Sequence, residues 1–116
     1  MSERPPAPLS PPVYHVLLAL GGEALHGYGI MQRFEQLLGG AEQILPGTLY
    51  ATLARMVQQG LIEETRGPRG EESGGPPRRH YRVTARGRAA TLAETERMRR
   101  LVAVARRRAW LPGLAR

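Results

Sequence analysis

The sequence predicts a mainly α fold with one small β-hairpin, arranged as a winged helix-turn-helix and followed by a long C-terminal helix. Three observations predict it. Apolar residues recur at helical spacing in three segments before residue 60. Two short alternating segments, residues 61–66 and 79–84, flank a stretch rich in glycine and proline. A last segment, from residue 85 to residue 110, is again helical in pattern and holds no proline.

Composition limits the function. A chain of 116 residues makes one small domain with an appended helix. Cysteine is absent, which excludes disulfides and thiolate metal sites. The net charge is +7, and every basic residue is arginine while every acidic residue is glutamate. Genome composition explains that bias, although guanidinium also suits bidentate contacts with phosphate and guanine. The sign of the charge favours a polyanionic partner.

The predicted location is the cytoplasm, with no membrane partner. No apolar run approaches the ~20 residues of a membrane span. The N-terminus is rich in proline and lacks the apolar segment of a signal peptide. Residues 1–9 are expected to form a disordered tail.

The first two helices are predicted from capping signals and apolar spacing. Ser10 is a plausible N-cap with Pro11 at the first helical position, and Gly21 ends the helix. Its apolar residues are Val13, Val16, Leu17 and Leu20. The second helix follows His26–Gly27 and ends at Gly39. Its apolar face holds Ile30, Phe34, Leu37 and Leu38.

The third helix is the candidate DNA-reading element. It begins at Pro46, ends before Gly60, and is expected to bury Leu49, Leu53 and Met56. The opposite face would then carry Thr48, Ala51, Thr52, Arg55, Gln58 and Gln59. Short side chains let a helix approach a groove floor, and Arg55 can reach guanine or phosphate. The helix N-terminus at Pro46 and Gly47 suits a phosphate. The alternative is an ordinary amphipathic helix with a polar surface.

The hairpin is the candidate wing. Tyr81 and Val83 are expected to alternate towards the core, while His80 points outward. Residues 67–77 form the tip. Arg78 and Arg79 stand at the strand base with no acid beside them in the sequence, so we expect them to contact DNA. The alternative is a solvated loop of mixed charge, since four glutamates share this region.

These motifs resemble the PadR family of bacterial transcriptional regulators. The resemblance rests on Leu25-His-Gly-Tyr-Gly-Ile30, Pro46-Gly-Thr-Leu-Tyr50, Gly60-Leu-Ile62, and Arg79-His-Tyr-Arg-Val-Thr84 with Gly87. It implies a winged-helix homodimer that binds a palindromic operator in double-stranded DNA and usually represses. It also implies that Tyr28, Thr48 and Tyr50 lie near the DNA backbone, although each tyrosine ring can instead pack and leave its hydroxyl in water. Leu45 departs from the family, which commonly has a serine cap there.

The last helix predicts a dimer. The expected organisation is a DNA-binding domain over residues 10–84, a dimerisation helix over 85–111 capped by Thr84, and a tail over 112–116. An early apolar stripe of this helix holds Ala85, Ala89 and Leu92. A later stripe has heptad spacing and is displaced around the helix from the first, so one small core cannot bury both. The alternative is a helix folded back on its own domain. The expected interface residues are Val13, Val16, Leu17, Thr95, Met98, Val102, Ala105 and Ala109.

The sequence therefore predicts a transcriptional repressor that is not an enzyme and needs no cofactor or metal. Its three histidines are scattered and have no metal-ligand spacing. Trp110, near the end of the last helix, is the candidate site for a small aromatic ligand, which the family resemblance implies; otherwise it covers the partner subunit. The alternative function is a winged-helix protein–protein interaction module that does not read DNA.

Overall fold

The computed structural model describes residues 7–39, 44–66 and 79–110. Within these ranges the chain is mainly helical, with four helices and a three-stranded antiparallel sheet, so the predicted fold class is confirmed. The elements are α1 (Pro11–Leu20), β1 (Leu25–His26), α2 (Gly27–Leu38), α3 (Pro46–Gln58), β2 (Ile62–Arg66), β3 (Arg79–Val83) and α4 (Ala85–Arg107). The predicted wing tip, residues 67–77, and the tail at 112–116 lie outside the described residues.

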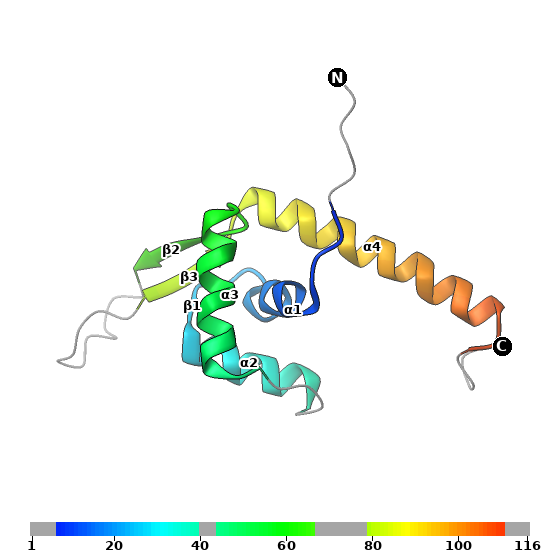
Figure 1. The fold of residues 1–116 in the computed structure, drawn as a ribbon, viewed down its shortest axis with the longest axis horizontal. Coiled ribbons are helices and arrows are strands. Elements are labelled where there is room, and N and C mark those ends of the chain that lie inside the picture. Colours follow the sequence, from blue (N-terminus) through cyan, green and yellow to red (C-terminus); the bar gives the residue numbers. More distant parts are fainter. Residues whose placement is uncertain (1–6, 40–43, 67–78, 111–116) are drawn as a thin grey trace, which may run out of the picture.

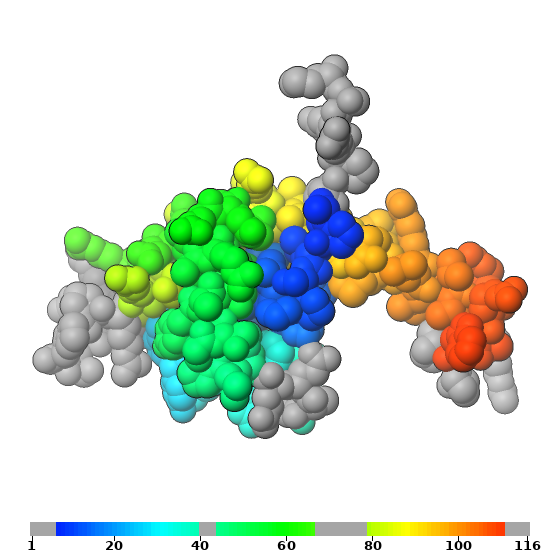
Figure 2. Space-filling model, in the orientation of Figure 1, coloured from blue at the N-terminus to red at the C-terminus, as the bar shows by residue number. Residues whose placement is uncertain are grey.

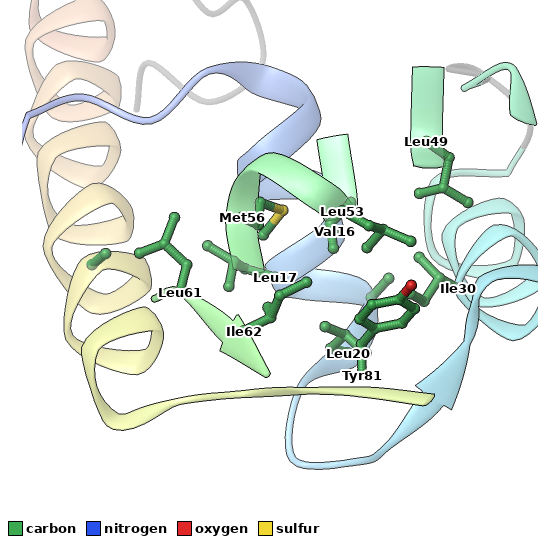
Figure 3. Packing of buried hydrophobic residues seen from close by; sticks show 12 residues of the cluster. Val16, Leu17, Leu20, Ile30, Leu49, Leu53, Met56, Leu61, Ile62 and Tyr81 are labelled. Carbon is green, nitrogen blue, oxygen red and sulfur yellow. The ribbon is translucent and has the colours of Figure 1, made fainter. Parts of the chain in front are cut away.

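The core is organised around α1. This helix contacts α2, α3, β3 and α4, and it lies between α3 and α4 in Figure 1. Leu17 and Leu20 of α1 are buried against side chains from α2, α3 and both long strands (Figure 3). All the residues expected inside α3 are buried. Because α1 is covered on several sides, its apolar stripe belongs to the protomer's own core.

The sheet has one strand that the sequence did not predict. Its order is β1-β3-β2, and Leu25 and His26 of β1 pair with Tyr81 and His80 of β3. A two-residue strand is too short to show the alternation from which strands are predicted. Its presence makes β3 the central strand. His80, expected to point outward, is instead 2% exposed, and its ring lies 5.3 Å from that of His26.

A compact junction joins α3 to α4. Gly60 follows α3 with a φ of 75°, as expected for a residue that ends a helix. Thr84 caps α4 as predicted, because its hydroxyl oxygen accepts from the Gly87 N–H at 3.0 Å. The same hydroxyl donates to the Gly60 carbonyl oxygen at 2.5 Å. One side chain therefore binds both the residue that follows the end of α3 and the start of α4.

The N-terminal segment is ordered earlier than expected. Leu9, predicted to be disordered, packs against the core, and its N–H donates to the Glu94 carboxylate at 3.1 Å; residues 1–6 lie outside the described part of the chain. Glu94 is only 5% exposed and is paired with Arg97. The hydrogen bond from Arg97 and that from Leu9 hold the Glu94 pKa below its usual value, and burial opposes them.

The last helix ends at Arg107, three residues before Trp110. The Trp110 N–H donates to the Ala105 carbonyl oxygen and the Ala109 N–H to that of Arg106. This is a Schellman motif, in which the residue after the cap adopts a left-handed conformation. Ala109 fills that position with a φ of 61°. Glycine is the usual residue at that position, and because alanine stands there instead, the sequence did not indicate where α4 ends.

The two halves of α4 have different surroundings. Its first half packs against α1 and β3, whereas its second half extends away from the rest of the molecule (Figures 1 and 2). The extending half carries exposed Leu101, Val102 and Val104. None of the helices within the described ranges is both long enough and apolar enough to cross a bilayer.

Candidate nucleic-acid interface

The outer face of α3 carries small and polar residues and no acidic ones. Leu49, Leu53 and Met56 are buried, as predicted, which turns the other side of the helix to solvent. The exposed residues of α3 are Pro46, Gly47, Thr48, Tyr50, Ala51, Ala54, Arg55 and Gln58. Most are small, so the α3 backbone can come close to a surface, while Arg55 and Gln58 supply the hydrogen-bond donors. Figure 2 shows α3 in green across the front of the molecule.

Thr52 was expected on this outer face, and that prediction is wrong. Its exposed fraction is 3%, and it lies among the inward residues of α3. The reason is helical geometry. Thr52 is three residues after Leu49 and four before Met56, which places all three on the same side of a 3.6-residue helix. Thr52 therefore helps to seat α3 on the core, and Arg55 and Gln58 remain as the long polar groups of the outer face.

The start of α3 is open to solvent. Leu45, in the N-cap position, makes no side-chain hydrogen bond to the helix, as its departure from the family pattern predicted. Pro46 occupies the first helical position, and it has no N–H to satisfy. The exposed Gly47 and Thr48 follow in the first turn. The helix dipole therefore presents its positive end at a surface with little steric obstruction.

A cleft of about 670 Å³ lies beside α3, where the start of α2 meets β3. Tyr28 and Tyr50 line it, and each is more than half exposed. The Tyr28 ring stacks on that of His26, with 6.3 Å between ring centres. Arg79 and Tyr81 complete the lining from the strand side. The cleft thus combines a guanidinium with phenol hydroxyls, a donor set that suits a phosphate group.

Two arginines of β3 lie near glutamates of β2. Arg79 is 3.6 Å from Glu64 across the hairpin, and Arg82 donates to Glu63 at 2.6 Å. The expectation that Arg79 has no acid beside it is therefore wrong in space, because strand pairing brings Glu64 near. Such exposed pairs are weak, so Arg79 can exchange its carboxylate for a phosphate. Arg78 lies outside the described residues.

Tyr81 connects the wing to the cleft. Its side chain is almost fully buried, and burial raises the pKa of its phenol, with the nearby Glu64 carboxylate adding to the effect. Arg79 acts in the opposite direction through its charge and a hydrogen bond. Tyr81 and Arg79 thus lie together on the strand side of the cleft.

The residues expected at a dimer interface fall into two groups. Val16 and Leu17 are buried in the protomer's own core, so their assignment to a dimer interface is wrong, whereas Val13 is only partly buried and its assignment stays a prediction. Ala109 lies beyond the end of α4 and cannot continue a helical seam. Thr95, Met98, Val102 and Ala105 are exposed or partly exposed along α4. The exposed apolar residues of the predicted seam therefore lie along α4, although Leu18 of α1 is also exposed.

Sequence reasoning missed part of the cleft. His26 and Gly27 were interpreted as a helix start and Tyr81 as a core residue, yet all three line it. Only the pairing of β1 with β3 brings these distant segments together, and no local pattern encodes that pairing. Among the described residues, no group of three histidine, aspartate or glutamate side chains is placed to hold a metal ion.

Comparisons with known proteins agree with this geometry. Residues 16–93 match the transcriptional regulator PadR-like family. A PadR family transcription regulator from Clostridium difficile R20291 is 24% identical, with 83% of this chain and 95% of that one covered and a TM-score of 0.69. A PadR-like transcription factor from Bacteroides fragilis is 25% identical, with 80% and 84% covered and a TM-score of 0.66.

A third solved structure is that of Bacillus subtilis PadR in complex with operator DNA. It is 23% identical, with 68% of this chain and 43% of that chain covered, and the TM-score is 0.58. These likenesses show a shared fold. No curated protein matches the sequence. Because the family match covers most of the chain and includes α3, the sheet and the start of α4, the chain belongs to the PadR-like family of transcriptional regulators.

Proposed function

We propose that the chain is a sequence-specific transcriptional repressor that binds a palindromic operator as a homodimer. The observation that carries the proposal is the exposed, acid-free face of α3, with Arg55 and Gln58 in its last turn. The cleft with Tyr28, Tyr50 and Arg79 flanks this face and supplies groups for the DNA backbone. The Bacillus subtilis relative was solved in complex with operator DNA, which supports DNA binding by this chain. Such a repressor works in the cytoplasm, where the DNA is.

The extending half of α4 supports the dimer. Leu101, Val102 and Val104 are large apolar side chains, each close to half exposed or more. A second copy of the helix would remove them from water, which stabilises the pair by about 25 cal/mol per Å² of apolar surface buried. A two-fold axis between the helices would place two α3 helices in successive major grooves about 34 Å apart. We propose residues 10–84 as the DNA-binding unit and residues 85–111 as the dimerisation segment.

The first test is binding to DNA at increasing salt. The chain should shift a fragment carrying its operator with two chains per site, and affinity should fall by roughly 10³ or more between 50 and 200 mM salt if ~6 or more phosphates are neutralised. Electrophoretic shifts on genomic fragments, followed by fluorescence anisotropy on the selected site, measure both. Unsaturable retardation of every fragment, or an affinity that does not respond to salt, would contradict the proposal.

We also propose that a small aromatic ligand binds at Trp110 and thereby releases the repressor from its operator. The indole is 77% exposed and lies three residues after the end of α4, the helix that carries the proposed dimer seam. Planar aromatic compounds stack on such a ring, and a ligand held between two copies would change their contact. The alternative is that Trp110 packs on the partner subunit.

Trp110 is the only tryptophan, so its fluorescence reports on this site alone. Titration with planar cations and phenols should give saturable quenching by the inducing class, with a parallel loss of operator binding. Trp110→Leu should retain operator binding but lose the response. Fluorescence unchanged by every compound would leave Trp110 as a packing residue.

A protein–protein interaction module remains the rival function. Its binding face would be apolar or acidic, whereas the exposed face of α3 is neither. The exposed Arg55, Arg66 and Arg79 add positive charge to this side of the molecule. This surface favours nucleic acid.

A further inference from the structure

The Tyr50 side chain lies so close to the Gly27 Cα that a residue with a Cβ at position 27 would collide with it. A methyl group built on the Gly27 Cα would lie 2.7 Å from the Tyr50 Oη atom, 2.8 Å from Cε1 and 2.9 Å from Cζ. Carbon atoms in proteins do not approach to these distances without displacement. Gly27 is the first residue of α2, and Tyr50 projects from α3. The Tyr50 ring therefore lies directly on the backbone at the start of α2.

This contact determines where the Tyr50 hydroxyl lies. Both residues line the cleft, together with Arg79 from β3. The Tyr50 side chain is 53% exposed, so the core does not hold it in place. Because Gly27 has no side chain, the Tyr50 ring can instead lie against the backbone at position 27. Tyr50 thereby combines its two sequence interpretations, since the hydroxyl edge of its ring packs against Gly27 while the residue lines the open cleft.

We propose that Gly27 is a positioning residue that places the Tyr50 hydroxyl for a hydrogen bond to a phosphate of the DNA backbone. The proposal rests on the proposed function and deepens it. The Tyr50 hydroxyl donates to a phosphate oxygen, while Arg79 supplies the positive charge at the other side of the cleft. Contact with one phosphate then joins the start of α2, α3 and the wing.

Stability and DNA binding should respond differently to a side chain at position 27. The atoms that an added methyl group would meet are at the far end of a half-exposed side chain, and such a side chain can rotate into solvent. Gly27→Ala should therefore fold with a Tm within a few degrees of the original chain. Its Tyr50 hydroxyl would be displaced from the cleft, so operator binding should weaken by about tenfold.

The experiment compares Gly27→Ala, Tyr50→Ala and the double variant in the full chain. The probe is a fluorescein-labelled duplex carrying the site that the unaltered chain selects from a random-sequence library. Anisotropy gives Kd, and thermal denaturation gives Tm. If Gly27 acts through Tyr50, the double variant should bind as Tyr50→Ala binds. The slope of log affinity against log salt should not change, because a phenol neutralises no phosphate.

Gly29→Ala is the matched control. It lies in the same helix, and its added methyl group would lie 3.5 Å from the His26 Cε1 atom, an ordinary contact. This variant should bind DNA as the original chain does. Should Gly27→Ala fail to fold, adding Tyr50→Ala should restore folding, because it removes the atoms in the way.

The outcomes separate the two proposals. If the original chain selects no duplex, the proposed function fails and this inference fails with it. If the chain binds but Gly27→Ala binds equally well, or the two substitutions weaken binding independently, only the positioning role is overturned. An unfolded Gly27→Ala that Tyr50→Ala does not rescue would also overturn it.

Discussion

Arg55→Glu should lower operator affinity by about 100-fold or more while the chain remains folded and dimeric. Arg55 is exposed in the last turn of α3 and is the only charged residue of that helix. Its loss removes a contact of about 1–3 kcal/mol, and a symmetric dimer loses it in both half-sites. The glutamate adds repulsion from phosphates. The fold changes little, because an unfavourable charge at a helix end costs only about 0.3–1 kcal/mol.

Arg100→Glu is the charge-matched control for this substitution. It changes the net charge equally, but Arg100 lies on α4, on the side of the helix opposite to Met98 and Val102. Binding should stay within a few-fold of the original. Anisotropy measures affinity, and sedimentation verifies the dimer. Unaltered binding by Arg55→Glu would favour the protein–protein interaction module over a DNA reader.

Gly87→Ala should destabilise the fold by about 3 kcal/mol, at the upper end of the usual range for overpacking. An added methyl group would lie 2.0 Å from the carbonyl oxygen of Leu61 and 2.9 Å from Val83 Cγ1. Unlike a side chain, the Leu61 carbonyl cannot rotate away, because it accepts a hydrogen bond from the Thr84 N–H. The start of α4 must therefore shift away from the strands, and Tm should fall by roughly 12 °C or more.

Gly22→Ala provides the comparison, because an added methyl group there meets no atom within 4 Å. Its Tm should stay within a few degrees of the original, as measured by circular dichroism or calorimetry. If the Gly87→Ala chain has the same Tm as the original chain, the start of α4 is not packed as closely against Leu61 as the structure has it.

The sequence predicted those features that local periodicity and capping encode. The inward side of α3, the hairpin strands and the Thr84 cap were all predicted, because spacing and residue type determine them locally. Thr52 could also have been placed correctly from its spacing to Leu49 and Met56. Thr52 was instead assigned to the outer face of α3 because its side chain carries a hydroxyl group. That error came from giving residue chemistry more weight than position on the helix.

Other features depended on tertiary structure and could not be predicted. The two residues of β1 form a strand only because β3 has a free edge beside them. The cleft brings together residues from β1, α2, α3 and β3, which no single segment indicates. The burial of Val16 and Leu17 follows from the position of α1 between other elements. Leu9 gains its place through Glu94, a partner 85 residues away.

The hydroxyl of Thr84 has a mechanical consequence. Since it bonds both to the carbonyl that follows α3 and to the first turn of α4, it ties the end of one helix to the start of the other. In a dimer joined through α4, each α4 acts as a rigid lever arm with an α3 fixed near its far end. A small change in the crossing angle of the two arms would alter the separation of the two α3 helices, and with it the operator length that the dimer accepts.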